Sequence, residues 1–390
     1  MRKLASIQRI KKVMPIEGAD RIELVSVLGW QCVAVKDEFK KGDLCVYFEI
    51  DSFLPIRPEF EFLRSSSFKN NEILGEGFWL KTKVFKGKIS QGLVLPLSTV
   101  GIVRKDNGDS SDNAKDYVFV SQDGSEIEMI DLIKPTSYNN LTLEGLDVTD
   151  LIGVKKWVIP EAATTGGTIM GNLPYGIHKT DEMRIQSTPE LLEEFRGKPY
   201  YITTKYDGSS HSISLDRNGD FHVTGHNYEY KDDGKSSFYE YVKKHGFEQK
   251  LRDYVALHGL LSITVQGEWC GPGLQKNRLK LAQPEWFVFT VDVDEKRVGW
   301  DEIRKVASEC GMNIVECQEI SETDDLPTVY PTVDELIKRS EHSIEKSTAY
   351  KGGQPEGIVI RPLTPVWSDT LGDYLSMKVI NNKYLIKNEK

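Results

Sequence analysis

The residues of this chain best suited to chemistry are Lys205-Tyr206-Asp207-Gly208. They lie between a strand-like segment, residues 200–204, and an alternating segment, residues 211–215. A lysine amine has a pKa of about 10.4, and it acts as a nucleophile only where neighbouring cations or burial favour its neutral form. The pattern allows two interpretations: a β-hairpin with Asp-Gly as its turn, or a strand end that presents a nucleophilic lysine.

Further reactive or binding groups stand on predicted strands downstream. Glu268 ends one strand, Glu356 precedes another, and Lys378 lies on the last. The period of two along a strand puts Phe287 and Phe289 on one face, where a ring could stack on a flat base. Taken singly, these residues also fit surface acids, core rings and a solvated lysine.

Length and composition indicate a globular protein of two or three domains. The chain has 390 residues, of which 39% are hydrophobic and 28% charged. It has no apolar run near the length of about 20 residues that spans a bilayer, and we expect no signal peptide. The five cysteines are scattered without CxxC spacing, which favours reduced thiols in an intracellular, cytoplasmic protein without zinc.

The net charge of −9 argues against a protein that coats nucleic acid through bulk charge. A local basic groove on an acidic body is still compatible with it, because phosphate contacts depend on where cations cluster. Two clusters are candidates for such a groove, and each also fits a solvated face. They are Lys81, Lys83, Lys86 and Lys88, and Lys276, Arg278 and Lys280.

The first part of the chain, residues 1–156, predicts an OB-like β-barrel of about five or six short strands. The expected strands are 22–27, 32–35, 44–50, 78–84 and 92–97. Residues 105–113 are polar and predict a loop.

Residues 157–176 are rich in glycine and proline and predict a linker, followed by a second domain at 177–390. That domain is expected to be α+β, with helices packed on mixed, largely antiparallel sheet. Ser187-Thr188-Pro189-Glu190 is expected to open the first helix. The expected helices are 191–196, 237–245, 247–257, 300–308 and 332–340, and the expected strands are 261–267, 286–293, 357–360 and 375–380.

The order of these motifs resembles motifs I, III, IIIa, IV and V of the covalent nucleotidyltransferases, the superfamily of DNA ligases, RNA ligases and messenger RNA capping enzymes. The matching elements are Lys-x-Asp-Gly, Gly267-Glu268, the aromatic strand, Glu356-Gly357 and Met377-Lys378. Residues 267–276 and 180–186 resemble RNA ligases in particular. Residues 16–23, 39–43, 47–55 and 90–93 resemble a family of nick-sealing ATP-dependent RNA ligases with an N-terminal OB domain.

The resemblance implies an RNA-repair enzyme. Lys205 would attack the α-phosphate of ATP and expel pyrophosphate, and AMP would then pass to a 5′-phosphate end. A 3′-hydroxyl would displace AMP and seal the strand. The implied partner is a nicked duplex with RNA on the 3′-hydroxyl side, with no membrane and no obligate protein partner. The choice of ATP over GTP comes from the resemblance alone.

The resemblance also implies roles for individual residues, with Mg²⁺ or Mn²⁺ as the metal because the available ligands are hard carboxylates. Asp207, Glu268 and Glu356 would hold the metal or bind the ribose. The catalytic residues would be Lys205 and Lys378; the nucleotide would contact Arg184, Thr204, Asp207, Gly208, Glu268, Phe289 (with Phe287 as the alternative), Glu356 and Lys378; and His226 and Asn227 would contact the nucleic-acid end.

The chain departs from the family pattern at three positions. His226 stands where related ligases commonly have arginine, Ile380 where some carry a second lysine, and Thr290 where an acid is frequent. Gly234-Lys235-Ser236 resembles the end of a P-loop, but Glu229 stands where its first glycine is required, so no kinase module is expected. The alternatives are an ATP-dependent DNA ligase and an inactive nucleic-acid-binding relative.

Overall fold

The computed structural model describes residues 2–105, 112–133, 141–158, 167–179, 181–350 and 353–388. The chain forms two compact units, one of residues 1–160 and one of residues 161–388. No helix in the described ranges is long and apolar enough to cross a membrane.

The main sheet of the first unit has five strands in the order β10-β4-β1-β2-β3. Its central strand, β1, was not predicted, because Arg9, Lys11 and Lys12 hide the apolar pattern of its first half. The predicted segments 22–27 and 32–35 lie on strands of this sheet, 44–50 does so as far as Phe48, and 92–97 does so from Leu93 to Pro96. The bounds are β1 Ala5–Pro15, β2 Ile22–Val27, β3 Trp30–Val35, β4 Leu44–Phe48 and β10 Leu93–Pro96.

Smaller sheets complete this unit. One has the order β14-β5-β7-β6, another β11-β12-β13, and β8 and β9 form a separate hairpin. The predicted strand 78–84 is wrong, since β7 ends at Trp79 and β8 begins at Lys83. The bounds are β5 Ser52–Leu54, β6 Phe68–Asn71, β7 Gly75–Trp79, β8 Lys83–Phe85, β9 Lys88–Ser90, β11 Ile102–Arg104, β12 Tyr117–Val120, β13 Glu126–Glu128 and β14 Lys155–Lys156.

The core of the first unit draws on both of its larger sheets. Ile7, Val46 and Phe78 are fully buried in it. The rings of Phe48 and Phe60 meet edge to face at 5.5 Å, which joins the main sheet to the 3₁₀-helix Pro58–Leu63 and the following helix α1, Arg64–Ser67. Of the loop predicted at 105–113, residues 106–111 lie outside the described ranges.

The larger sheet of the second unit has the order β15-β20-β19-β18-β21-β22-β23, and β24 pairs with β22. Strand β15 falls within the segment predicted as a linker, of which residues 159–166 lie outside the described ranges. The bounds are β15 Ile169–Asn172, β18 Ser209–Leu215, β19 Phe221–Thr224, β20 Tyr228–Tyr230, β21 Ile263–Cys270, β22 Glu285–Val293, β23 Lys296–Arg297 and β24 Asn313–Ile314.

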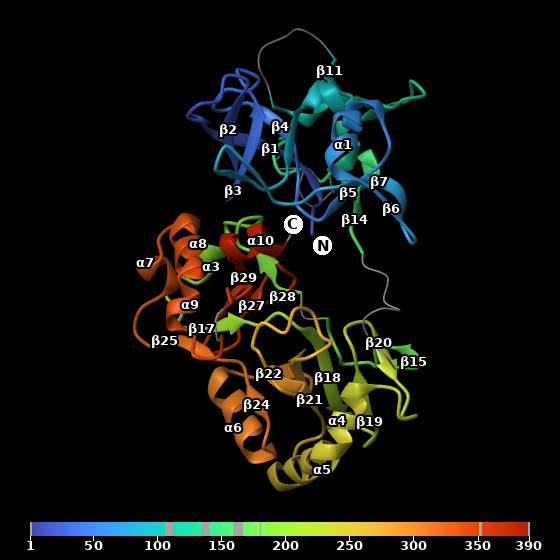
Figure 1. Cartoon of the computed structure of the whole chain (residues 1–390), viewed down its shortest axis with the longest axis vertical. Helices are drawn as coiled ribbons and strands as arrows, with labels where there is room; N and C mark the ends of the chain where they lie inside the picture. The colour runs from blue at the N-terminus through green and yellow to red at the C-terminus, as the bar shows by residue number, and fades with distance from the viewer. Residues whose placement is uncertain are drawn as a thin grey trace. The chain divides into compact units, whose positions relative to one another are not determined.

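A second, five-stranded sheet of this unit has the order β16-β29-β26-β17-β25. Figure 1 shows β17 near β25 and β29, whereas β18 lies with β21 and β22 of the larger sheet. The bounds are β16 Met183–Arg184, β17 Tyr200–Lys205, β25 Cys317–Ser321, β26 Gly357–Pro362 and β29 Met377–Ile380, with a small hairpin of β27 Trp367–Ser368 and β28 Asp373–Tyr374.

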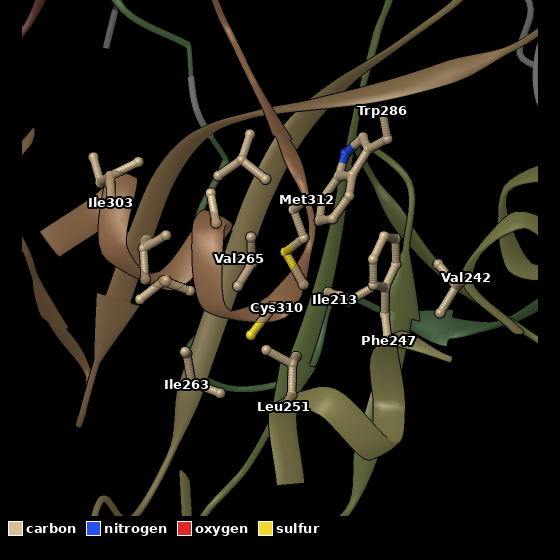
Figure 2. Packing of buried hydrophobic residues seen from close by; sticks show 14 of the residues in the cluster. Ile213, Val242, Phe247, Leu251, Ile263, Val265, Trp286, Ile303, Cys310 and Met312 are labelled. Carbon is tan, nitrogen blue, oxygen red and sulfur yellow. The ribbon is translucent and has the colours of Figure 1, made fainter. Parts of the chain in front are cut away.

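Helices α4, α5 and α6 contribute to the core of the larger sheet. Figure 2 shows Val242, Leu251 and Ile303 from these helices together with Ile213 and Val265 from the strands. Local signals fix these helices: the Ser236 hydroxyl accepts from Tyr239 N at 3.2 Å at the start of α4, and Gly246 ends it in the left-handed conformation. The bounds are α4 Ser237–His245, α5 Phe247–His258 and α6 Trp300–Cys310.

The other helices of this unit are α3, Leu191–Glu194; α7, Leu326–Val329; α8, Val333–Glu341; α9, Ser343–Lys346; and α10, Asn382–Asn388. The expectation that Ser187 or Thr188 caps α3 is wrong, because Glu190 is its N-cap and makes no side-chain capping bond. Helix α8 begins with a capping box between Thr332 and Glu335.

Candidate active site

Lys205 ends β17 at the junction of the two sheets of the second unit. β17 pairs with β25 and β26, whereas β18 pairs with β19 and β21. The hairpin interpretation of Lys-x-Asp-Gly is therefore wrong. The run carries the chain from one sheet to the other and leaves Lys205 where the two sheets meet.

Gly208 permits this crossing by its lack of a side chain. A Cβ at this position would lie 2.5 Å from Trp269 O and 2.7 Å from Cys270 Sγ. The Gly208 N–H donates to Glu268 Oε1 at 3.0 Å. The close approach joins the lysine segment to β21, which carries Glu268.

Lys205 is ion-paired in a largely desolvated setting. Its Nζ lies 2.7 Å from Glu356 Oε2, and both side chains are 20% exposed. Burial works to lower the pKa of Lys205, but the carboxylates of Glu356, Glu268 and Glu182 outweigh burial and hold that pKa above its ordinary value. In this arrangement the amine is therefore an ammonium ion.

The same cluster of charges disfavours the ionised form of Glu268. Burial, together with the neighbouring charges of Glu356 and Asp207, raises the pKa of Glu268 to about 7 even though Lys205 works to lower it. The site thus holds more carboxylates than its one central ammonium can satisfy.

Arg361 and Glu182 form a second buried pair. The Arg361 guanidinium donates to Glu182 and, at 3.0 Å, to the carbonyl oxygen of Phe289. Burial alone would raise the pKa of Glu182, but the charges of Arg361, Lys378 and Lys205 bring it below the ordinary value. Arg361 therefore fixes both an acid beside Lys205 and the strand segment that carries Phe289.

Phe289 lies at an irregularity in β22. Gln266 pairs with Thr290 and Gly267 with Val288, which leaves Phe289 as the extra residue of a β-bulge. Phe289 lines a cavity with Lys205, Glu268, Glu182 and Arg361; the same cavity is bordered by Thr203, Thr204, Tyr206, Ser210, Val315 and Val359.

Phe287, the alternative stacking residue, is directed elsewhere. Its ring meets Tyr206 edge to face, with centroids 5.1 Å apart. Both Phe287 and Phe289 pack against the small apolar cluster that contains Tyr206 and Tyr350. Of the two rings, Phe289 is the one that borders the cavity.

Strand pairing brings Arg184 and Lys378 to this edge of the smaller sheet. The two are partners across β16 and β29, and β29 pairs in turn with β26, which follows Glu356. Lys378 Nζ lies 2.8 Å from Asp181 Oδ1. Burial, joined by the Lys205 and Arg184 charges, lowers the pKa of Lys378, although Asp181 opposes this.

Asp207 is engaged by a residue from a distant part of the chain. Arg278 Nε donates to Asp207 Oδ2 at 2.7 Å, and both side chains are 12% exposed. The Arg278 guanidinium also lies over the ring of Tyr384 in α10, 4.7 Å from its centroid. Of the predicted basic cluster 276–280, Arg278 is thus part of the site.

Thr204 uses its hydroxyl within the protein. It donates to Glu316 Oε2 at 2.8 Å and accepts from Gln318 Nε2 at 2.6 Å. Glu316 N in turn donates to Tyr206 Oη at 3.3 Å. Glu316 therefore braces the residues on both sides of Lys205, and the Thr204 hydroxyl is committed to that role.

His226 and Asn227 lie at the turn between β19 and β20, and neither borders the cavity that Lys205 lines. Asn227 Oδ1 accepts from Lys179 at 2.7 Å. Thr180, the first residue of the segment 180–186, lies outside the described ranges.

Thr290 and Ile380, two of the residues that depart from the family pattern, are buried in the structure. Thr290 is 1% exposed and Ile380 2%. Ile380 pairs with Gly357 in the middle of the smaller sheet. Lys383 donates to the carbonyl of Glu341 at 3.4 Å, so it makes a different contact from Lys378.

The three predicted metal ligands are occupied by protein donors. Asp207 binds Arg278, Glu268 binds Gly208 N and Glu356 binds Lys205. Across the described ranges, no three His, Cys, Asp or Glu side chains are grouped to hold a metal ion. The carboxylate oxygens of Asp207, Glu268 and Glu356 are nevertheless the hard ligands that Mg²⁺ and Mn²⁺ prefer. The excess of carboxylates around Lys205 also favours a divalent cation.

Sequence reasoning assigned no role to several residues of this site: Glu182, Arg361, Glu316, Asp181 and Tyr384. Arg361 follows directly on the Glu-Gly-Ile-Val-Ile run, and Glu182 lies in the segment before Arg184. Alternation along β26 could have placed Arg361 on the face of Val359. No local signal marks Glu316 or Tyr384.

Comparisons with known proteins agree with this architecture. A model of the OB-fold domain matches residues 4–97, and the RNA ligase family model matches residues 198–380. No curated protein matches the chain by sequence.

Solved structures of Naegleria gruberi RNA ligase resemble the chain over its whole length. A variant with ATP and Mn is 25% identical, with a TM-score of 0.76, and the match covers 99% of each chain. A variant with AMP and Mn is 25% identical with a TM-score of 0.76, covering 100% of this chain and 99% of that one. The ligase with pyrophosphate is 26% identical with a TM-score of 0.75, over the same shares. Residues 198–380 therefore belong to the RNA ligase family, and an OB-fold domain precedes them in the chain.

Proposed function

We propose that this RNA ligase uses ATP to form a covalent lysyl-AMP intermediate on Lys205 and seals 5′-phosphate to 3′-hydroxyl ends at nicks in RNA-containing duplexes, as in RNA repair. The observation that carries the proposal is the position of Lys205 at the junction of two sheets, against Glu356 and beside Glu268, Phe289 and Arg361. The ATP-bound and AMP-bound relatives support the choice of nucleotide.

In the first step, a bond forms between Lys205 Nζ and the α-phosphorus of ATP, and the bond to pyrophosphate breaks. Nζ must lose a proton before it attacks. Glu356 Oε2, 2.7 Å from Nζ, is placed to receive that proton. Phe289 would stack on the adenine, and Lys378 and Arg184 would neutralise phosphate oxygens from the neighbouring strands.

Asp207, Glu268 and Glu356 are the residues that would hold Mg²⁺ or Mn²⁺. When bound, the cation would offset the carboxylate charge that now keeps the proton on Lys205, and it would polarise the phosphate. Arg278 would then have to release Asp207, because the two are now paired at 2.7 Å.

In the second and third steps, AMP passes from Nζ to a 5′-phosphate, and a 3′-hydroxyl displaces AMP as the phosphodiester forms. The family match to an OB-fold domain supports a grip on nucleic acid by the first unit. We propose the segments 1–156 and 177–390 as the nucleic-acid-binding and adenylyltransferase domains, joined at 157–176. His226 and Asn227 remain our proposed contacts to the nucleic-acid end.

The test is incubation of the full chain with ATP labelled at the α-phosphate, followed by mapping of the labelled peptide. Label is expected on the peptide that contains Lys205 and is expected to be absent from Lys205→Ala, while Lys36→Ala, changed at an exposed lysine of the first unit, labels normally. A Lys205→Ala protein that still takes up label would exclude this mechanism.

The substrate is tested with a panel of nicked duplexes. The proposal expects faster sealing where the 3′-hydroxyl side is RNA. Equal sealing of nicks with DNA on both sides would favour a DNA ligase. If the protein forms lysyl-AMP normally but seals none of the duplexes, its substrate is something other than a nick.

A further inference from the structure

The β8–β9 hairpin of the first unit lies beside β3 of the main sheet without joining its strand order. Its two strands form a separate two-stranded sheet among the described elements. The turn residues Lys86 and Gly87 both have positive φ, 49° and 77°, as a tight two-residue hairpin turn requires. A hairpin of this size is marginal by itself and needs contacts with its surroundings.

Three such contacts hold the hairpin in place. Lys86 Nζ donates to Gly18 O at 2.8 Å in the β1–β2 connection, and Lys83 Nζ donates to Ser66 O at 3.2 Å in α1. At the base, Ser90 Oγ accepts from Val33 N at 3.0 Å. The hairpin is thus fixed before any partner arrives, which reduces the ordering cost of binding.

One face of the hairpin combines an aromatic ring with lysines. Lys83 pairs with Ser90 and Phe85 with Lys88, so these four side chains share a face. Phe85 is 39% exposed, and on the other face Val84 is 47% exposed. An open aromatic ring flanked by cations is the combination that binds nucleic-acid strands.

The local charge contrasts with that of the whole chain. Residues 81–90 contain four lysines and no acid, in a protein of net charge −9. Burial lowers the pKa of Lys83, and repulsion from the nearby ammonium of Lys81 lowers it further. A phosphate placed between them would relieve that repulsion.

We propose that the β8–β9 hairpin is an RNA-binding element of this ligase, with Phe85 against a base or sugar and Lys88 against a backbone phosphate of the duplex that is sealed. The inference rests on the proposed function, since it names the surface by which the first unit holds the substrate. It assigns this contact with the nucleic acid to a preformed hairpin of the first unit and not to the second unit, which carries Lys205.

The test uses the full chain with two variants, Phe85→Ala and Lys88→Ala, and a nicked RNA duplex with a fluorescent label. The controls are Phe62→Ala, which removes a ring that is 59% exposed beside Glu61, and Lys36→Ala, which removes an exposed lysine beside Asp37. Binding is measured by anisotropy across a range of salt concentrations.

Loss of the ring is expected to weaken binding about 5- to 150-fold with little change in salt dependence. Loss of Lys88 is expected to weaken binding and to reduce the slope of log affinity against log salt by about 0.7–0.9, the signature of one lost phosphate contact. The controls are expected to match the unchanged protein.

Two further readings separate the possible failures. Lysyl-AMP formation is measured for every protein with ATP and Mg²⁺ and without RNA. If the unchanged protein does not form lysyl-AMP, the proposed function fails. Normal formation together with unchanged RNA binding in both hairpin variants overturns only the hairpin proposal. Loss of lysyl-AMP in the hairpin variants would show a contact within the chain and would also overturn it. The hairpin proposal would also be overturned if polyglutamate displaced the labelled duplex as strongly as unlabelled RNA does, because the surface would then bind acidic protein.

Discussion

Lysines in the two units of this protein have opposite surroundings. Lys205 is 20% exposed and lies 2.7 Å from a carboxylate, beside two more acids and a second buried ion pair. Lys86 and Lys88 of the hairpin are exposed, in a stretch with no acid. The first setting controls when an amine gains or loses a proton, and the second offers charge to a partner. Burial and neighbouring carboxylates, not residue type, therefore separate the two settings.

Ion pairs follow the same division. The side chains of Arg361 and Glu182 are 8% and 13% exposed, whereas those of Arg64 and Glu61 in the first unit are 49% and 41% exposed. Removing one partner of a buried pair strands a charge, while water takes over from a lost surface partner. This contrast can be tested directly.

The largest effect is expected from Arg361→Ala. It would leave the Glu182 carboxylate buried without its cation, and the free energy of unfolding should fall by about 3–5 kcal/mol. Urea titration followed by fluorescence measures the loss. Arg64→Ala is the matched control and should show no measurable change; equal losses in both variants would remove the distinction between the two settings.

The next effect concerns Glu268 and depends on pH. Its pKa is about 7 against an ordinary value of 4.5, so the folded protein holds a proton that the unfolded chain releases. Below about pH 4.5 the ionisation of Glu268 therefore costs the wild-type protein no stability. As the pH rises to 7 and above, it lowers the free energy of unfolding by roughly 3 kcal/mol. Glu268→Gln removes that ionisation.

The variant should accordingly gain stability relative to wild type as pH rises from about 4.5 to 7, and the gain should level off above that range. Unfolding in urea at several pH values, with chelator present, measures it. A stability difference that stays constant with pH would show that Glu268 titrates normally.

A smaller effect is expected at Gly357, which pairs with both Lys205 and Ile380. A Cβ there would lie 2.1 Å from Val379 O, so Gly357→Ala should force β26 and β29 apart. The expected cost is about 1–3 kcal/mol, with slower lysyl-AMP formation because Glu356 is displaced. Gly171→Ala, which has open space around its Cβ, is the control; similar losses in the two variants would contradict the steric argument.

The smallest effect is expected from Lys86→Ala. Its ammonium makes an exposed hydrogen bond to Gly18 O, and stability should change by no more than about 0.5 kcal/mol. Thermal unfolding measures this. A larger loss would mean that the Lys86 contact contributes to global stability as well as to the position of the hairpin.

The sequence alone determined which chemical groups are present and in what order. Lys205, Glu268, Glu356 and Lys378 stand in the order of the nucleotidyltransferase motifs, and the family match covers that part of the chain. Helix α4 could be predicted to its last residue, because its cap at Ser236 and its stop at Gly246 are local signals. Local signals act through neighbouring residues, so they can be read without the fold.

Only the tertiary structure decided how these groups meet. It separated β17 from β18 into different sheets, placed β1 at the centre of the OB-fold sheet, and joined Arg361 to Glu182 across 179 residues. It also left Lys205 protonated among carboxylates and committed the Thr204 hydroxyl to Glu316. Strand pairing and desolvation depend on residues far apart in the chain, and for that reason the sequence could name the lysine but not its surroundings.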